Sequence, residues 1–92
     1  MKYAEFKAPK GVIKVELTLS EDNTLSRISL SGDFFIYPEE ALEHLEKTLL
    51  GVKAEVESLM AAVKNFYQTT GAQTPLIGPE HWVEAILRAA RS

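Results

Sequence analysis

The sequence predicts an α+β domain: a three-stranded antiparallel sheet with three helices packed on one face. Over the first third of the chain, hydrophobic residues alternate with polar ones, which is the pattern of half-buried strands. After residue 38 the hydrophobic spacing changes to that of amphipathic helices. A sheet and helices that are each apolar on one side bury those sides against each other, so we expect residues 1–92 to form a single domain.

Three strands are expected in the N-terminal third, at about residues 2–8, 12–19 and 25–33. In the second of these, the odd positions from Ile13 to Leu19 are apolar and the even positions are polar, so one face is buried. Pro9-Lys10-Gly11 precedes this strand and predicts a turn. Residues 20–24 are rich in Ser, Asp and Asn and predict a second turn. Consecutive strands with short connections form a meander.

Three helices are expected to follow, at about residues 38–50, 53–69 and 79–91. Pro38 is placed as the first helical residue, because its missing N–H would have no intrahelical partner there. Gly51 is expected to end the first helix as a left-handed cap. Glu43 and Lys47 are spaced for an ion pair on the polar side of that helix.

The composition excludes several classes of function. Hydrophobic residues make up 46% and charged residues 25%, which is ordinary for a soluble domain. The absence of cysteine excludes disulfides and thiolate chemistry on this chain. A net charge of -3 without a basic block gives no support for a nucleic-acid partner. No apolar run approaches the roughly 20 residues of a membrane span, and the N-terminus lacks a signal-peptide core. We therefore expect no membrane association and a cytoplasmic location.

No catalytic or metal-binding constellation is recognised. His44 and His81 each lie beside glutamates in an expected helix, and the spacing supplies no further metal ligands, so both are expected to be surface histidines. Neither a nucleophile elbow nor a glycine-rich phosphate loop occurs. We assign no catalytic, cofactor-binding or metal-binding residue, and expect a binding or structural module.

Residues 31–38 follow neither hydrophobic period. Four large apolar or aromatic side chains stand in a row there, more than a small domain buries on one side. We expect Phe34 and Ile36 in the core. Phe35 and Tyr37 then point the other way and are candidates for a partner surface. The candidate interface residues are Asp33, Phe35, Tyr37 and, in the basic N-terminal hairpin, Lys10.

The segment 31–52, SGDFFIYPEEALEHLEKTLLGV, resembles the signature segment of the lipoate–protein ligase C-terminal domain. The resemblance extends upstream through the hairpin turn at Pro9-Lys10-Gly11, where Lys10 replaces one of the two glycines common in the family. It extends downstream to residues 78–86, GPEHWVEAI. It therefore covers essentially the whole chain.

The resemblance implies a function shared with another chain. The family's enzymes form lipoyl-AMP from lipoate and ATP, and then transfer the lipoyl group to a lysine of an acceptor protein. A large domain, whose motifs are absent here, holds the nucleotide, the lipoate and the catalytic lysine. The resemblance thus implies a non-catalytic accessory subunit that forms a heterodimer with the catalytic subunit and enables lipoyl-AMP formation. ATP, Mg and lipoate would bind to that partner chain, with no cofactor on this one.

Three other functions remain open at this point. The first is a cysteine-less adaptor or scaffold related to iron–sulfur assembly proteins, which share the general sheet-and-helix layout. The second is a lipoyl acceptor modified at Lys10, although acceptor domains are all-β and much of this chain predicts helix. The third is an independent small-molecule hydrolase or transferase, for which the nucleophile motif is missing.

Overall fold

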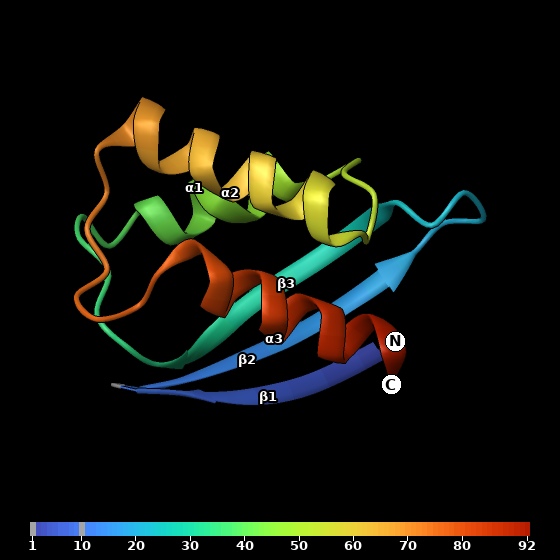
Figure 1. Ribbon diagram of the computed structural model, residues 1–92, viewed down its shortest axis with the longest axis horizontal. Coiled ribbons are helices and arrows are strands. Elements are labelled where there is room, and N and C mark those ends of the chain that lie inside the picture. The colour runs from blue at the N-terminus through green and yellow to red at the C-terminus, as the bar shows by residue number, and fades with distance from the viewer. Residues whose placement is uncertain (1, 10) are drawn as a thin grey trace.

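The computed structural model describes residues 2–9 and 11–92. Its strands are β1 (Lys2–Ala8), β2 (Gly11–Leu19) and β3 (Leu25–Asp33), which form an antiparallel sheet in the order β1-β2-β3. The helices are α1 (Ala41–Leu49), α2 (Val56–Thr70) and α3 (Pro79–Arg91). Figure 1 shows all three helices on one side of the sheet. The predicted α+β fold is confirmed.

The sheet presents its apolar face to the helices. In the central strand β2, the side chains of Ile13, Val15 and Leu17 are fully buried, whereas the residues between them are exposed. The pairing with β3 shifts register between Thr18 and Leu19, at a bulge just before the β2–β3 turn. The alternation therefore fixes which face of β2 meets the core.

The helices form two layers over this face. α3 packs across β1 and β2, α1 packs beside β3, and α2 bridges α1 and α3 on the side away from the sheet. Trp82 of α3 and Phe66 of α2 are the largest fully buried side chains, and Leu45 of α1 meets them in the same cluster. Burying each such side chain contributes roughly 1.5–3 kcal/mol, so this cluster holds the layers together.

The first helix begins later than expected, because the chain before it is held extended. Pro38 is not the first helical residue: the Tyr37–Pro38 peptide is cis and α1 begins at Ala41. A tight turn precedes the helix, in which the Ala41 N–H donates to the Pro38 carbonyl at 3.0 Å. Tyr37 itself exchanges two backbone hydrogen bonds with Gln73, so the chain can turn into the helix only after it.

The second helix also begins later than expected, at Val56 rather than near residue 53. The intervening backbone pairs with the start of β3 instead of continuing a helix. The Leu25 N–H donates to the Val52 carbonyl at 2.9 Å, and the Gly51 N–H donates to the Leu25 carbonyl at 2.8 Å. Gly51 has the expected left-handed conformation, with φ 82°, but an extended residue, Leu50, separates it from the last residue of α1.

α1 also covers part of the free edge of β3. The carboxylate of Glu46 accepts the Leu30 backbone N–H at 2.6 Å, a donor that would otherwise face outward from the edge strand. On the polar side of the helix, Glu43 and Lys47 form the predicted ion pair at 3.7 Å. That pair is exposed and contributes little to stability. The hydrogen bond between Leu30 and Glu46 has a clearer role, because an edge strand with free N–H groups can pair with a strand of another chain.

Gly32 allows two strands to approach closely just before the aromatic segment. Its φ is 135°, and a Cβ added there would lie 2.0 Å from the Val12 carbonyl oxygen. Only a residue without a side chain can occupy such a position without displacing the backbone. The tight contact fixes the point at which β3 leaves the sheet, and so the direction of the residues that follow.

Candidate partner-docking surface

Side chains alternate between core and solvent along the connection from β3 to α1. Ile36 is buried, and the ring of Phe34 packs edge-on against Trp82 with centroids 5.1 Å apart. Phe35 and Tyr37 face outward and are 65% and 52% exposed. The expected directions of the four side chains are thus those in the structure, with Ile36 in the core and Phe34 half-buried against it. A role in binding a partner remains a prediction.

The two exposed rings form a flat apolar surface, here called the aromatic pair. The rings of Phe35 and Tyr37 are stacked, with centroids 6.3 Å apart and planes within 6° of parallel. Their backbone is not free to move as a loose loop. The Tyr37 N–H donates to the Gln73 carbonyl at 2.8 Å, and the Gln73 N–H donates to the Tyr37 carbonyl at 2.9 Å. The aromatic pair is therefore fastened to the loop between α2 and α3.

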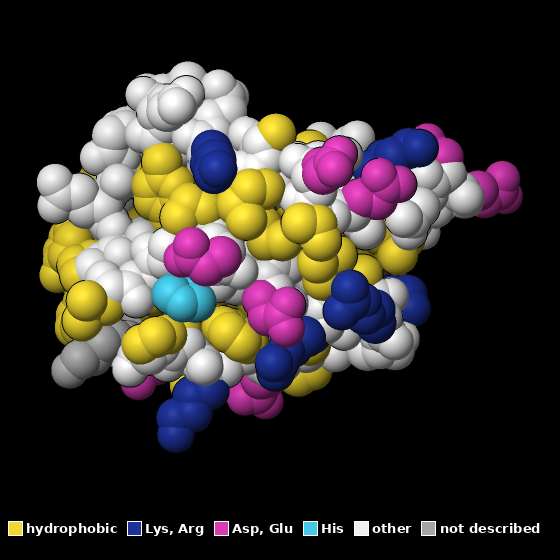
Figure 2. Space-filling view, in the orientation of Figure 1, with side chains coloured by type: hydrophobic (Ala, Val, Ile, Leu, Met, Phe, Trp, Pro, Cys, Tyr) yellow, Lys and Arg dark blue, Asp and Glu magenta, His cyan; other side chains and the backbone are white. Residues whose placement is uncertain are grey.

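Other exposed residues lie at the same end of the molecule. Asp33, the third interface candidate, is exposed at the end of β3 and pairs with Val12. Lys10, the fourth, falls outside the described residues. Leu76, in the α2–α3 loop, is 65% exposed and adopts a left-handed φ of 64°, which is uncommon for a leucine. Figure 1 places both connections at one end of the fold, and Figure 2 shows hydrophobic side chains gathered there.

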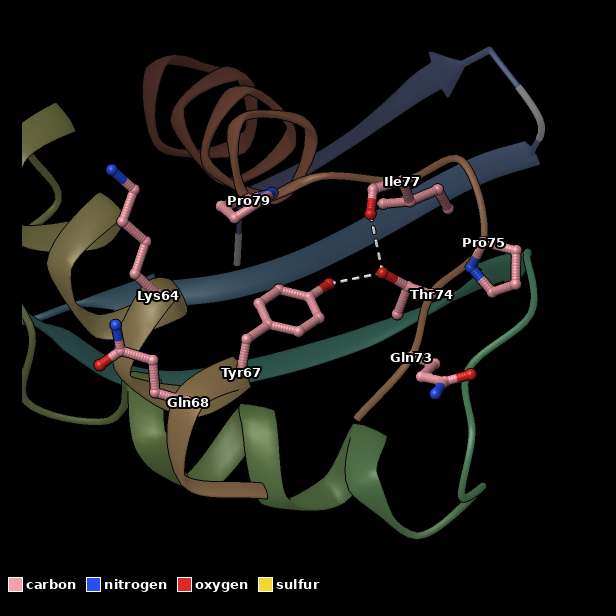
Figure 3. Close-up of a pocket in the computed structure, with 8 residues that line it drawn as sticks. All are labelled: Lys64, Tyr67, Gln68, Gln73, Thr74, Pro75, Ile77 and Pro79. Carbon is pink, nitrogen blue, oxygen red and sulfur yellow. Dashed lines mark hydrogen bonds between the residues drawn. The ribbon is translucent and has the colours of Figure 1, made fainter. Parts of the chain in front are cut away.

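A pocket of about 600 Å³ opens between α2 and the α2–α3 loop (Figure 3). We call it the α2–α3 pocket. Its walls are mostly apolar, and a few polar groups converge on it. The lining residues are Lys64, Tyr67, Gln68, Gln73, Thr74, Pro75, Ile77 and Pro79. This composition, apolar with a few placed polar groups, is typical of binding sites.

A directed chain of hydrogen bonds runs from the buried Trp82 to Tyr67, Thr74 and Ile77, and the last three residues line the pocket. The Trp82 indole N–H donates to the Tyr67 hydroxyl at 2.6 Å, and the Thr74 hydroxyl donates to the Ile77 carbonyl at 2.8 Å. The Tyr67 and Thr74 oxygens are 2.7 Å apart, and because the Thr74 proton is already used, Tyr67 donates to Thr74. Each hydroxyl oxygen has two lone pairs and accepts one bond here, so each retains one acceptor position.

The sequence did not point to this chain of bonds, although a signal for it was present. Tyr67 and Trp82 both lie on the apolar stripes of their helices, and each has a polar group at its tip. A buried Tyr or Trp usually finds a hydrogen-bond partner for that tip. Two such residues on helices that pack together are therefore candidates for a shared polar contact, but which partners meet depends on the packing.

His81 and His44 both contact other side chains or backbone groups of the fold. The Gly78 N–H donates to His81 Nδ1 at 2.8 Å, so His81 satisfies a free donor at the start of α3. Its ring also stacks on Phe6, with centroids 6.1 Å apart. His44 is exposed on α1 near the ring of Phe66. Within residues 2–9 and 11–92, no group of three or more His, Asp or Glu side chains could hold a metal ion. No helix in these ranges is long and apolar enough to cross a membrane.

Two groups away from the docking surface have shifted pKa values. A hydrogen bond from the Tyr3 hydroxyl to Glu5 raises the pKa of Tyr3. Hydrogen bonds from the hydroxyls of Ser20 and Thr24 lower the pKa of Asp22 and tie together the β2–β3 turn. These polar contacts stabilise the hairpin and its edges, and neither group lines the α2–α3 pocket.

The family model described as the bacterial lipoate protein ligase C-terminus matches residues 2–84. The chain belongs to this family. The expectation drawn from residues 31–52 is therefore confirmed. Among curated proteins, this lipoate–protein ligase C-terminal domain is similar to lipoate-protein ligase A subunit 2 of Thermoplasma acidophilum. The two are 37% identical over 81 residues, which is 88% of this chain and 82% of the relative.

A solved structure from Thermoplasma acidophilum has the same fold. This C-terminal domain matches one of its chains with a TM-score of 0.82 and 36% sequence identity, covering 91% of each chain. That structure is described as a bi-partite lipoate protein ligase and its E2 lipoyl domain, from an archaeal lipoylation system. In the relative, a chain of similar length is thus named as one subunit of the ligase.

Proposed function

We propose that this chain is the accessory subunit of a two-chain lipoate–protein ligase and acts by docking on a separate catalytic chain. The similarity to subunit 2 of the Thermoplasma ligase, which spans most of both chains, is the observation that carries the proposal. The bi-partite description of the matching solved structure supports a heterodimer.

In this proposal the catalytic chain binds ATP, Mg²⁺ and lipoate, and the accessory chain enables the formation of lipoyl-AMP. Adenylate formation brings an anionic carboxylate to a triphosphate, and it benefits from ordered loops and excluded water. A docked domain can supply both by binding the closed form of the catalytic chain more tightly than the open form. A preference of about 3 kcal/mol would shift that equilibrium more than 100-fold.

The aromatic pair is the proposed centre of the docking surface. Aromatic side chains are enriched at interface cores, and each can bury on the order of 150–250 Å². Phe35 and Tyr37 are among the most exposed large hydrophobic residues of the described chain, yet their backbone is fixed. A rigid pair loses little freedom on binding. A stable interface buries about 800 Å² per partner, so the neighbouring loop must contribute as well.

Pyrophosphate release measured with each chain alone and with both chains mixed tests this function. With lipoate and MgATP present, we expect release only at background level from either chain alone and a large increase in the mixture. Equal release from the catalytic chain without its partner would reject the enabling role. The intact mass of the accessory chain, taken from the same mixture, is expected to stay unchanged. A lipoyl adduct on it would favour the acceptor function instead.

A further inference from the structure

We propose that the α2–α3 pocket receives an extended segment of the catalytic chain, one that carries an apolar side chain with an acidic side chain close to it. This inference rests on the proposed function and states what the docking surface binds. It concerns residues of α2 and the α2–α3 loop, which neither the sequence patterns nor the family resemblance singled out.

The pocket shares one wall residue, Gln73, with the backbone pairing that holds the aromatic pair. Gln73 lines the pocket and is bonded through its backbone to Tyr37, so one residue joins the two features. Figure 3 shows the β3–α1 connection running beside Gln73 and Pro75 at the pocket's edge. Leu76, exposed in a left-handed conformation, is in the same loop. In this proposal, a partner that covers the aromatic pair also extends over Gln73 to the mouth of the pocket.

The shape of the pocket favours a protein segment over a free small molecule. Small-molecule sites commonly enclose about 70–90% of their ligand's surface. The α2–α3 pocket has a volume of about 600 Å³ but opens broadly to solvent. A small ligand would leave much of its surface in water there, whereas a segment of a docked chain is covered on its outer side by the rest of its own protein.

The positive charge of Lys64 at the rim of the pocket favours an occupant with an acidic side chain. Among the described lining residues, Lys64 carries the only formal charge, so no lining carboxylate neutralises it. An acidic side chain on the incoming segment would pair with the ammonium group, and binding would desolvate the pair more than an ordinary surface contact. A second copy of this chain fits less well, because each copy carries a net charge of -3.

Two hydroxyl oxygens among the pocket-lining residues have acceptor capacity left, which in this proposal serves the backbone of the occupant. The Tyr67 and Thr74 hydroxyl oxygens each retain one lone pair after their internal bonds are counted. An extended peptide has N–H donors that point sideways from its axis. The amide groups of Gln68 and Gln73 at the rim can donate to its carbonyls. The pocket thus matches an extended backbone with one apolar side chain inserted against Ile77 and the two prolines.

Two pocket variants with matched controls test the proposal. Lys64→Glu reverses the rim charge, and Gln68→Trp fills the mouth, both at exposed positions of α2. The controls are Lys53→Glu, with the same change in charge at an exposed position of the connection before α2, and Asn65→Trp, which lies on α2 outside the pocket lining. Isothermal titration against the lipoate–protein ligase catalytic chain of the same organism gives the Kd of each, and thermal unfolding confirms that each variant is folded.

Each pocket variant is expected to weaken the complex about tenfold or more, and each control by less than about twofold. The loss caused by Lys64→Glu should shrink at high salt. If the wild-type complex forms and both pocket variants bind equally well, the pocket inference is overturned and the docking function stands. If the wild-type chain does not bind at all, both are rejected. Two further results would assign the pocket to another occupant and overturn the proposal. One is a homodimer of this chain that Gln68→Trp disperses. The other is a shift of the NMR resonances of the pocket residues on addition of octanoate, with the affinity of the complex unchanged.

Discussion

Replacing both Phe35 and Tyr37 by alanine is expected to weaken association with the catalytic chain by at least about 100-fold. Central aromatic residues of an interface each contribute about 2 kcal/mol or more, and the combined effect of two neighbours falls short of a simple sum. Both side chains are more than half exposed, so their loss should leave the stability of the isolated chain nearly unchanged. Isothermal titration of the wild-type and double-variant chains measures the difference.

A matched control uses exposed hydrophobic residues elsewhere on the surface. Leu50 and Val56 are 49% and 52% exposed; Leu50 follows the last residue of α1, and Val56 is the first residue of α2. Replacing both by alanine removes a similar kind of surface without touching the aromatic pair. We expect this variant to bind like the wild type. Wild-type affinity in the Phe35/Tyr37 variant would remove those residues from the interface.

Trp82→Ala is expected to destabilise the fold by about 3–5 kcal/mol, the usual cost of deleting a large buried aromatic side chain. Trp82 is fully buried, supports Phe34 edge-on and donates to Tyr67. Domains of this size are stable by only about 5–15 kcal/mol, so the loss is a large part of the total. Because Phe34 precedes the aromatic pair, the variant should also bind the catalytic chain more weakly.

Urea unfolding followed by far-UV circular dichroism measures this effect, since the variant lacks the chain's single tryptophan and its fluorescence. Trp82→Phe is the matched comparison: it keeps an aromatic ring but leaves the Tyr67 hydroxyl without its donor. That loss should cost about 1–3 kcal/mol. An unfolding midpoint for Trp82→Ala close to that of the wild type would show that the core does not depend on this residue.

The parts of the fold that depend on local patterns could be predicted from the sequence. Ile13, Val15 and Leu17 alternate with polar residues, and a strand with that pattern has only one way to face a core. Residues 34–37 show no such polar and apolar alternation, but four large side chains in a row cannot all be buried, and successive side chains of an extended chain point in opposite directions. Both assignments follow from the geometry of an extended backbone, without knowledge of distant contacts.

The third helix begins at Pro79 as predicted, but the starts of the first two helices could not be predicted, because distant pairings set them. The start of α1 depends on the pairing of Tyr37 with Gln73, and the start of α2 on the pairing of Lys53 with Thr24. Pro38 and the glutamates after it are suited to a helix start, but local preference is weak compared with such contacts. The α2–α3 pocket was missed for the same reason, since its lining residues come from two helices and a loop.

The most direct test of the proposed docking surface is amide hydrogen exchange, measured on this chain with and without the catalytic chain. Complex formation should slow exchange in peptides that contain residues 34–37 and 73–77, and leave the β2–β3 turn at residues 20–24 unchanged. Protection confined to the turn or to the exposed face of the sheet, with no change around Tyr37 and Gln73, would contradict the assignment.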